Sequence, residues 1–569
     1  MMKKILCTVL ALSMVMCLVP STFAEDVTAE GKCGDSVTWK IVGNTLTFSG
    51  SGAMDKFIDM AWYNYRNDIY NVVIEEGITY LPYELLRDLK WFSSVKIPDS
   101  VTSVGALIFS NCMGLETVEI GKGLKSITPS AFSNCPKLEE IAVSPENENL
   151  ASVGGVLFNK DITNLIYFPN GWFDKENIGE NEGNYTIPDT VTKITDGALN
   201  GKLYLKNFYT NENSAYTAEN GVLFNKDKTE LVRYPSGNER STYIIPESVQ
   251  NIYESAFSYA ENLTDVTLPQ NISKLADNTF SDCTNLKGIE IPKNVTEIGS
   301  YAFSDCSNLE KAVLHDGIVT LGSGVFYECG ALKYADIPKN LTEIPRSTFY
   351  GCESLKNIKL PGSVKTVAFS AFQRCTSLTE IDIPQSVTLI NSSAFEDCES
   401  LKTVTFRNSG IVQSYVFSGC PNLTRVNIFS DSIVIWGDTF YDEAEKTKDI
   451  YFAVSADNVV TGREDGKVCV EDLSENGGLK NVRLHCNTPS TVSSMAESEG
   501  KTAVSVNAKN IDAQSKVVAG FYKNGALADI KVCDVSDLTA ETDKDFDTVK
   551  IMTFPSLPSL EPLCIKEEL

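Results

Sequence analysis

The two histidines are the side chains best suited to acid–base chemistry at neutral pH, and neither stands in a catalytic arrangement. His315 falls at a position that is proline in similar segments of the chain, where a structural surface role is expected. His485 precedes Cys486, but neighbours on a strand point to opposite faces and cannot form a nucleophile–base pair. The chain also lacks the G-x-S-x-G, H-E-x-x-H, Walker and paired CxxC patterns. We therefore predict a protein that is not an enzyme and carries no cofactor.

Carboxylates offer the other chemistry that the composition allows. Asp543, Asp545 and Asp547 alternate as at the start of a calcium loop, but the following Gly and the Glu at loop position twelve are absent. Counting alone leaves a glycosidase pair of carboxylates open, yet most acidic residues fall at positions that we expect to face solvent. We predict no metal site.

An excess of acidic residues sets the charge of the chain. Its 75 Asp and Glu against 49 Lys and Arg give a net charge of −26. Nucleic acids and anionic membrane surfaces require clustered Lys and Arg, so both are disfavoured as partners. After residue 24 no stretch reaches about 18 apolar residues, so we predict no membrane insertion of the mature form.

The cysteines are regularly spaced. Six of the 16 follow one another at intervals of 23 residues: Cys283, Cys306, Cys329, Cys352, Cys375 and Cys398. Cys420 follows after 22 residues, and Cys112 and Cys135 keep the 23-residue interval upstream. This regularity favours a ladder of small buried thiols, because free Cys behaves as a buried hydrophobe. Disulfides between adjacent ladder positions are the alternative.

The residues between the cysteines repeat with the same period. The pattern is C-x-x-L-x-x-I-x-I-P-x-x-V-x-x-I-x-x-x-A-F-x-x, and about thirteen such coils run from Arg66 to Phe440. The Leu and Ile positions predict a short strand with one apolar side, which the proline ends. A constant coil length lets each strand lie parallel to its neighbour at about 4.8 Å, so like residues stack on like. The sequence therefore predicts a mainly β repeat solenoid, in which no single coil could fold alone.

This 23-residue unit, with Pro, Ile-Gly (as at Ile298-Gly299), Ala-Phe and Cys, resembles the BspA-type leucine-rich repeats of bacterial surface proteins. The resemblance covers residues 66–442. It implies a curved leucine-rich-repeat array of parallel strands and a role in adhesion or protein binding. Those roles are implied by analogy, because a fold does not determine a function.

Two coils are interrupted at the same point, by insertions at 144–186 and 211–244. Both contain Gly-Val-Leu-Phe-Asn-Lys-Asp, at 155–161 and at 221–227, followed by a second apolar stretch that ends in Pro169 or Pro235. Apolar strand, polar turn and apolar strand predict a hairpin. We expect each hairpin to protrude from the solenoid and to be a binding element.

The ends of the chain complete the predicted domain order. Lys3-Lys4, an apolar stretch and Ala24 indicate a secretory signal peptide over residues 1–24. Residues 25–65 are predicted to form an N-terminal β cap, because Val37, Trp39 and Ile41 alternate before a Gly43-Asn44 turn. The last seven residues lack an apolar tail and an LPxTG-type sorting signal, so any attachment to the cell surface is expected to be non-covalent.

Beyond the repeat we expect a C-terminal cap or linker over residues 443–489, with a closing strand at 450–454. The composition then shifts toward Ser, Thr and Ala, and strands are predicted at 502–506, 517–522, 527–532 and 548–554. These strands and the Asn524-Gly525 turn predict a small β-sandwich module over residues 490–569.

The outward strand positions are the predicted binding surface. They carry the candidate binding residues Tyr334, Asp336, Lys359, Asp382 and Arg425. Tyr and Arg are enriched at binding hot spots, so Tyr334 is the predicted anchor.

The resulting hypothesis is a non-catalytic, secreted or surface-associated bacterial protein that binds an extracellular or host protein. The alternative is a carbohydrate-binding accessory protein of an extracellular polysaccharide-degrading system. That alternative predicts a glycan platform on exposed aromatics such as Trp62 or Trp172.

Overall fold

The computed structural model describes residues 27–56, 60–172, 183–212, 214–429, 433–436 and 439–440, and the backbone of strands between Lys448 and Phe554. The predicted signal peptide, Cys486, the predicted Asn524-Gly525 turn and the Asp543–Asp547 stretch lie outside the described residues. The chain divides into two compact units, with the boundary between Ala151 and Ser152.

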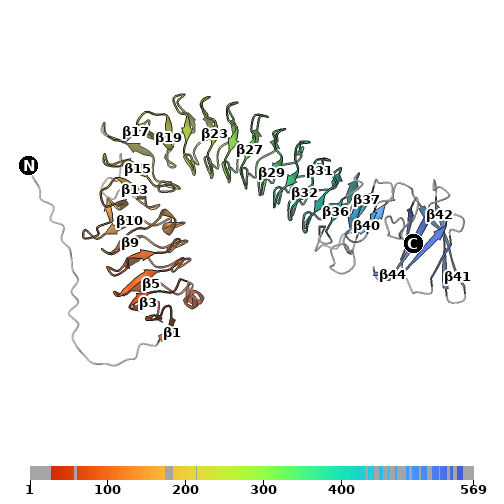
Figure 1. Cartoon of the computed structure of the whole chain (residues 1–569), viewed down its shortest axis with the longest axis horizontal. Helices are drawn as coiled ribbons and strands as arrows, with labels where there is room; N and C mark the ends of the chain where they lie inside the picture. The colour runs from red at the N-terminus through yellow and green to blue at the C-terminus, as the bar shows by residue number, and fades with distance from the viewer. Residues whose placement is uncertain are drawn as a thin grey trace, which may run out of the picture. The chain divides into compact units, whose positions relative to one another are not determined.

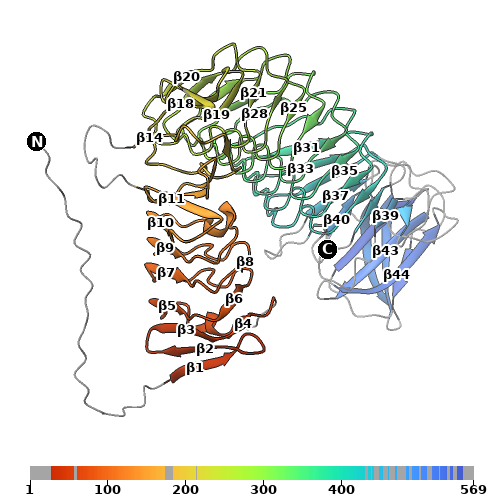
Figure 2. The same cartoon turned by 60° about the vertical axis from the view of Figure 1, so that its left-hand side comes forward.

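Unit 1, up to Ala151, begins with an antiparallel hairpin and continues as a stack of parallel strands (Figure 2). One wall consists of β1 (Val27–Lys32), β2 (Val37–Val42), β3 (Thr45–Gly50), β5 (Asn71–Ile74), β7 (Ser94–Ile97), β9 (Thr117–Ile120) and β10 (Glu140–Val143). A second wall consists of β4 (Gly52–Ala53), β6 (Ile78–Leu81) and β8 (Ser103–Val104). Two 3₁₀ turns complete the unit, η1 (Ala61–Tyr65) and η2 (Pro129–Phe132).

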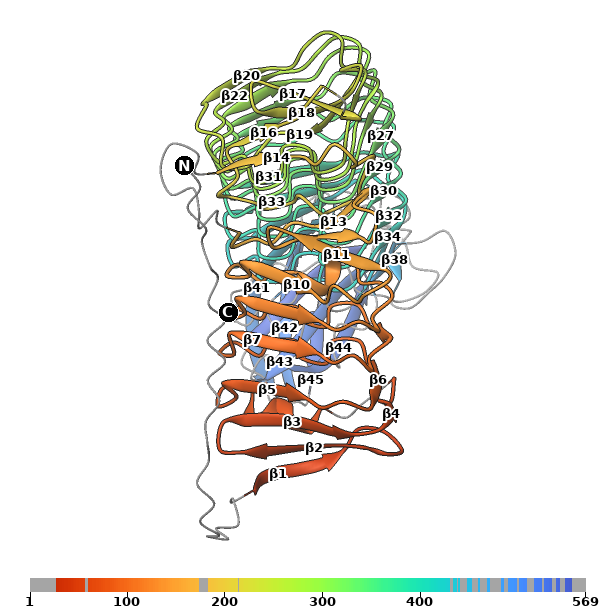
Figure 3. The same ribbon diagram turned by 90° about the vertical axis from the view of Figure 1, so that its left-hand side faces the viewer.

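The first hairpin follows from the alternation of apolar residues in β2. Val37, Trp39 and Ile41 are buried while Thr38 and Lys40 are exposed, and the two-residue Gly43-Asn44 turn brings β3 back antiparallel. β3 then pairs in parallel with β5, from which the stack of β7, β9 and β10 grows (Figure 3). The hairpin agrees with the sequence, and its role as a cap remains a prediction.

Unit 2 continues the coils in two rows of short strands (Figure 1). The first row consists of β14 (Asn184–Thr186), β16 (Asn207–Tyr209), β20 (Thr242–Ile244), β22 (Asp265–Thr267), β24 (Gly288–Glu290), β26 (Lys311–Val313), β28 (Tyr334–Ala335), β31 (Glu380–Ile383), β33 (Thr403–Phe406) and β35 (Arg425–Ile428). The second row consists of β15 (Lys193–Ile194), β21 (Asn251–Ile252), β23 (Lys274–Leu275), β25 (Glu297–Ile298), β27 (Thr320–Leu321), β29 (Glu343–Ile344), β30 (Thr366–Val367), β32 (Leu389–Ile390), β34 (Ile411–Val412) and β36 (Val434–Ile435).

Partners in adjacent strands are one repeat apart, as in Lys311 with Tyr334 and Glu380 with Thr403. The predicted parallel solenoid, with almost no helix, is therefore the observed architecture.

The interior of unit 2 is built from like residues stacked on like. Nine phenylalanines, one from each coil between Phe257 and Phe440, form a ladder whose neighbouring ring centroids lie 4.9 to 5.8 Å apart. The planes of neighbouring rings differ by 1 to 23°. Each ring completes the burial of the next, so every internal coil depends on both neighbours.

The cysteines are a second ladder. The ten described cysteines are free and buried. In each of the nine repeat coils that carries one, the thiol donates a hydrogen bond to a backbone carbonyl oxygen of the preceding coil, at 2.9 to 3.3 Å. Burial raises the pKa of Cys283 to about 12, so its thiol stays protonated and remains a donor. The free-thiol interpretation of the 23-residue spacing agrees with this arrangement.

Both insertions contain the predicted hairpin, but neither hairpin protrudes. β12 (Val156–Asn159) pairs antiparallel with β13 (Asn164–Tyr167), and β18 (Val222–Asn225) with β19 (Glu230–Arg233). β13 and β19 then pair in parallel with strands of the second row, and β11 (Leu150–Val153) and β17 (Tyr216–Glu219) complete the two sheets. The expectation of a protruding element was wrong, because three successive apolar residues bury both faces of each hairpin: Val156, Leu157, Phe158 and Val222, Leu223, Phe224.

Parallel pairing continues beyond the end expected from the repeat. β37 (Lys448–Phe452) pairs with β35, and β40 (Val482–His485) pairs with β37. In the second row, β39 (Val468–Val470) pairs with both β36 and β38 (Val459–Val460). The coil motif disappears in this segment while the strands persist.

The last six strands form two antiparallel sheets. One consists of β41 (Ser490–Ser498), β42 (Lys501–Ala508) and β45 (Thr539–Thr542), and the other of β44 (Ala526–Asp534), β43 (Lys516–Lys523) and β46 (Thr548–Phe554). The four predicted strands correspond to β42, β43, β44 and β46. Their assembly into a β-sandwich remains a prediction.

Candidate functional site

The coil fixes which positions face solvent. Counted from the cysteine as position 1, the exposed strand residues are at positions 6 and 8, as Lys311 and Val313 show in β26. Positions 19 and 23 adopt left-handed backbone, with φ of 56° at Tyr301 and 58° at Asp305. Because L-residues rarely adopt this conformation, a non-glycine side chain at these positions is held at a local energetic cost.

His315 has a structural environment. Its Nδ1 accepts a hydrogen bond from the backbone N–H of Gly317 (3.1 Å). Its Nε2 lies 2.9 Å from the carbonyl oxygen of Pro292 in the preceding coil and therefore acts as the donor. Nε2 joins the ring to the preceding coil and Nδ1 caps the turn of its own coil, so both ring nitrogens have structural partners, which matches the role expected from its position. His485 lies on β40, where only the backbone is described.

The first two candidate binding residues are Tyr334, which lies on β28, and Asp336, which directly follows the strand. Tyr334 is 50 % exposed, and its hydroxyl donates a hydrogen bond to Oδ1 of Asp336 (2.7 Å). This bond holds the phenol against the strand, so the aromatic ring is presented in one orientation.

The other three candidates follow along the same row. Lys359 is exposed, but residues 356–360 form no strand, and Ile358 beside it is only partly buried, so the backbone is held less firmly to the core. Asp382 accepts hydrogen bonds from Nε of Arg407 at 2.8 and 3.0 Å. Arg425 donates from Nε to Oδ1 of Asn427 (3.0 Å). The structure thus brings the five residues to one exposed row. Tyr334 lies in one sheet, Asp382 and Arg425 lie in another, and Lys359 lies in the strandless segment between them.

The two tryptophans named for a glycan platform do not form one. Trp62 is 1 % exposed and packs edge-on against Trp39 and Phe48, with centroids 5.5 and 5.2 Å away. Trp172 packs against Phe168 (5.0 Å) and donates its indole N–H to the carbonyl oxygen of Gly154 (2.7 Å). The expectation of an exposed ring was wrong for Trp62, which is buried, whereas Trp172 is half-buried and its indole is held by these internal contacts.

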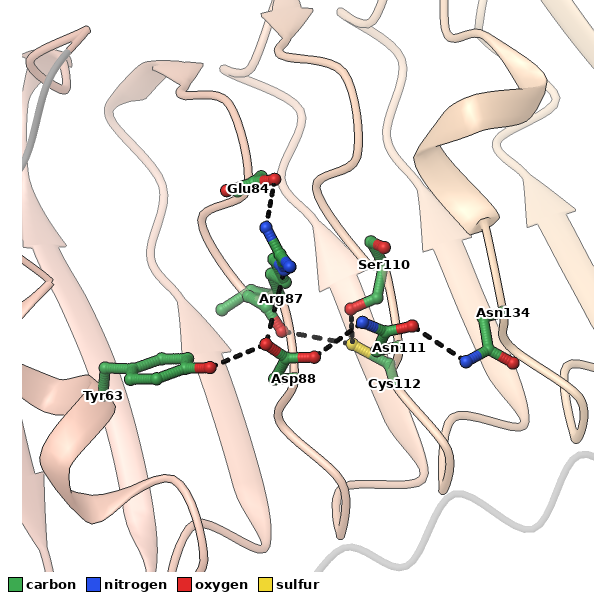
Figure 4. Close-up of polar contacts among 9 residues, drawn as sticks. Tyr63, Glu84, Arg87, Asp88, Ser110, Asn111, Cys112 and Asn134 are labelled. Atoms are coloured by element: carbon green, nitrogen blue, oxygen red, sulfur yellow. Dashed lines mark hydrogen bonds and ion pairs between the residues drawn. The ribbon is translucent and has the colours of Figure 1, made fainter. Parts of the chain in front are cut away.

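Position 23 of unit 1 carries a continuous polar ladder (Figure 4). The hydroxyl of Tyr63 donates to Asp88 (2.6 Å), the amide of Asn111 donates to Asp88 (2.7 Å), and the amide of Asn134 donates to Asn111 (2.8 Å). Burial opposes ionisation of Asp88, but these hydrogen bonds and the Arg87 charge outweigh it and hold the pKa of Asp88 below its usual value. Side chains at this coil position can therefore satisfy one another when a carboxylate is followed by amides.

Position 23 of unit 2 instead carries successive carboxylates beside a row of tyrosines. We call this set the tyrosine–acid row. Its acids are Asp282, Asp305 and Glu328, and its aromatic residues are Tyr259, Tyr301, Tyr327 and Tyr350. The rings of Tyr327 and Tyr350 stack at 4.7 Å with 7° between their planes, and Tyr301 meets Tyr327 edge-on at 6.1 Å.

One end of the tyrosine–acid row already holds a guanidinium. Nη1 of Arg374 lies 3.2 Å from Oε1 of Glu328, and its Cζ lies 5.8 Å from the centroid of Tyr350. Gly351 makes this reach possible, because it occupies position 23 of the intervening coil. A Cβ added at Gly351 would lie 2.5 Å from Oε2 of Glu328, where the carboxylate now lies.

The residues that the structure describes contain no cluster of His, Cys, Asp and Glu suited to a metal ion. Within the same described part, no helix is long and apolar enough to cross a membrane.

The repeats match a known family. The model described as BspA type Leucine rich repeat region (6 copies) matches residues 56–181, 237–356 and 319–447, together more than half of the chain. The chain belongs to the BspA-type leucine-rich repeat family. Proteins of this family are generally protein-binding or surface proteins of bacteria, and the resemblance noted from residues 66–442 is confirmed.

Solved structures of bacterial leucine-rich repeat proteins are similar to this BspA-type chain. A leucine-rich repeat protein of Eubacterium ventriosum is 24 % identical, over 67 % of this chain and 94 % of its own, with a TM-score of 0.40. A leucine rich cell surface protein of Faecalibacterium prausnitzii is 23 % identical, over 68 % and 96 %, with a TM-score of 0.32. The search of curated proteins returned no match.

Sequence reasoning missed the tyrosine–acid row of this BspA-type protein. The signal was present, because Asp282, Asp305 and Glu328 are 23 residues apart, as are Tyr327 and Tyr350. The repeat pattern left positions 22 and 23 unassigned, since neither is apolar. Trp91 was missed as well: it is 52 % exposed and stacks on Tyr70 at 6.3 Å.

Proposed function

We propose that this BspA-type protein is secreted or displayed at the cell surface, binds another protein through the outward side chains of its solenoid, and has no catalytic role. The observation that carries the proposal is the exposed row that includes Tyr334, Asp336, Asp382 and Arg425 on strands whose inward residues are buried. The inward side chains hold the coils together, so the outward ones remain for a partner.

Rigidity supports this proposal. The Phe ladder from Phe257 to Phe440 and the Cys ladder from Cys283 to Cys420 fix the coils that carry the row against one another, so the outward side chains lose little freedom on binding. Tyr334 and Arg425 belong to the residue types that contribute most to protein interfaces. The mixture of acidic and basic side chains on the row favours a protein partner over a uniformly charged polymer.

Capture of a partner tests the proposal. The mature full-length chain is immobilised and exposed to extracellular-matrix extract and to the surface proteins of neighbouring cells, and bound proteins are identified by mass spectrometry. We expect a defined partner, whose affinity falls about tenfold or more in the double variant Tyr334→Ala/Arg425→Ala, because hot-spot truncations cost upward of about 1 to 2 kcal/mol each.

The matched control is Thr267→Ala/Asn357→Ala, which truncates two exposed positions of the same row without removing an aromatic ring or a charge. It should bind as the wild type does. If the wild-type chain captures no protein while a glycan array shows specific binding, the function proposed here is wrong.

A further inference from the structure

The acidic side of the tyrosine–acid row is stacked by the backbone. The N–H of Asp282 donates to the carbonyl oxygen of Ser304 (2.8 Å), and that of Asp305 to the carbonyl oxygen of Tyr327 (2.7 Å). These bonds join adjacent coils at the residues that carry the carboxylates. Since coil spacing is about 4.8 Å, the two acidic side chains emerge side by side.

Tyrosines flank these two acids. The hydroxyl of Tyr259 hydrogen-bonds to Asp282. Burial is the main cause that raises the pKa of the Tyr327 phenol, followed by Tyr350, Glu328 and then Asp305, so the Asp305 carboxylate lies near that ring. Tyr301 is 39 % exposed and lies over Gly324, where an added Cβ would be 2.4 Å from Cε1 of the ring. The pair of acids is therefore bordered by aromatic rings.

No cation of the described residues pairs with Asp282 or Asp305. Among the ion pairs between described side chains, Arg374 reaches Glu328 and Glu353, and none reaches the other two acids. The charged groups that face Asp282 are Asp305 and Glu261, both acidic. The contrast with unit 1 is direct: there the equivalent positions after Asp88 are Asn111 and Asn134, whose amides satisfy the ladder.

The chain itself shows which ligand chemistry the row accepts. At its other end a guanidinium lies against both a carboxylate, Glu328, and a phenol ring, Tyr350. The Asp282–Asp305 end also has carboxylates beside phenol rings, but no arginine of the described residues pairs with them. Arg suits such a site because its planar, weakly hydrated head pairs with carboxylates and stacks on aromatic rings.

We propose that Asp282 and Asp305, together with Tyr259, Tyr301 and Tyr327, form a binding site for an arginine side chain of a protein partner. This inference rests on the protein-binding function proposed above and names the chemistry of the partner. The guanidinium takes the place that Arg374 takes at Glu328, donating to the carboxylates while its face meets a tyrosine ring.

Asp282 accepts hydrogen bonds from Ser281 and Tyr259, and Asp305 accepts one from Ser304, but neither acid has a cationic partner among the described residues, which supports a ligand site. Burial and the neighbouring Asp305 raise the pKa of Asp282 to about 6, so keeping both groups ionised at neutral pH disfavours the folded chain. Active and binding surfaces commonly retain such locally unfavourable arrangements, which a bound ligand relieves.

The test uses a fluorescent nona-arginine peptide and the full-length protein at physiological salt, read by anisotropy. In Asp282→Asn/Asp305→Asn the two acids become amides, as at the equivalent positions in unit 1, so the coil should remain folded. The matched control is Glu290→Gln/Glu297→Gln, which removes two exposed charges from the same region on other faces. We expect about tenfold weaker binding for the first variant and less than about twofold for the control.

Two further readouts separate a built site from general attraction to an acidic protein. Nona-lysine should bind more weakly than nona-arginine to the wild type, and Tyr301→Ala/Tyr327→Ala should remove that difference. Binding to the wild type should weaken from pH 7 to pH 5 as Asp282 protonates, and this change should shrink in Asp282→Asn/Asp305→Asn.

If Asp282→Asn/Asp305→Asn and Glu290→Gln/Glu297→Gln lose affinity for nona-arginine equally, the proposed arginine site is wrong. Two outcomes distinguish a wrong arginine site from a wrong proposed function. A partner that is captured equally by the wild type and by Asp282→Asn/Asp305→Asn removes the site and leaves protein binding intact. Site-specific arginine binding by a chain that captures no protein removes the function and leaves the site.

Discussion

At the scale of single residues, Arg233 is a buried cation that no described carboxylate neutralises. Its guanidinium is 3 % exposed and donates to Ser255 O, Ser258 O, Ser258 Oγ, Ser236 Oγ and Asn200 Oδ1. Burial lowers its pKa to about 10, so it remains protonated at neutral pH. These five hydrogen bonds, three from Nη1 and two from Nη2, join the end of β19 to Asn200 of the preceding coil and to Ser255 and Ser258 of the following coil.

Replacing Arg233 by Ala should destabilise the protein by about 3 kcal/mol or more, because it opens a cavity and leaves buried carbonyl oxygens without donors. Calorimetric melting of the purified chain measures the loss. Arg240→Ala is the control, since Arg240 is exposed and its Nη1 donates only to Asn220 O (2.6 Å). Similar melting curves for the two variants would contradict the structural role of Arg233.

Asp282 should make stability depend on pH. Its pKa is raised from 3.8 to about 6, so the folded chain binds this proton more tightly than the unfolded chain does. Stability from this group is therefore greatest below 3.8 and declines as the pH rises to about 6, then stays constant.

Asp282→Asn should accordingly raise the melting temperature at pH 7 and change it little near pH 4. The gain is at most about 1 kcal/mol, because the group is partly screened by solvent. A destabilised variant at pH 7 would show that the carboxylate is favourably paired.

At the scale of elements, the coil is the structural unit and its phenylalanine is the most sensitive position. Phe326 is fully buried and stacks on Phe303 (5.8 Å) and Phe349 (5.5 Å). The ring therefore packs in the core of its own coil and of both neighbouring coils. We expect its removal to destabilise β26 and β28.

We expect Phe326→Ala to cost about 3 to 5 kcal/mol and to increase hydrogen exchange in the coils on either side. Phe369→Ala is the matched control: its ring is 45 % exposed and contacts the guanidinium of Arg346. That variant should lose less than about 1 kcal/mol. If Phe326→Ala loses protection from hydrogen exchange throughout the chain, the stability of a coil does not depend mainly on its neighbours.

Most of the elements could be predicted from the sequence. The 23-residue spacing located the strands of the first row, the turn after each of them and the buried Phe, but it did not predict that the opposite wall also forms short strands such as β23 and β25. It failed where the motif was replaced: the hairpins at Val156 and Val222 were placed outside the core, although three successive apolar residues require burial on both faces. It also failed at β40, because short strands beyond the motif carry no signal except pairing.

The candidate site was predicted only in part. Alternation along a strand was sufficient to place Tyr334, Asp336 and Arg425 outside, because side-chain direction follows from period two. The orientation of Asp282 and Tyr301 could not be derived in this way. Left-handed backbone at positions 19 and 23 turns those side chains, and such conformations at Asp, Ser and Tyr leave no sequence signal as clear as glycine.

At the scale of the whole molecule, the stack should tolerate the removal of a complete coil. Deleting residues 376–398 joins Cys375 to Glu399, so the next coil inherits an equivalent thiol and an equivalent Phe neighbour. We expect this variant to be secreted and to show the β-type circular dichroism and cooperative melting of the parent chain.

Deleting residues 376–387 instead shifts the register by about half a coil and brings inward positions outward. Aggregation or loss of export is the expected result for this control. If both deletions fold equally well, the coils do not depend on register.

The thiol ladder gives the molecule its own position-specific probes. Each thiol in the ladder is shielded until the coil around it opens, because its hydrogen points to a carbonyl oxygen in the preceding coil. An alkylating reagent would therefore mark only coils that have opened. The order in which Cys112, Cys283, Cys352 and Cys420 become labelled, read by mass spectrometry, would reveal where unravelling starts without any engineered tag.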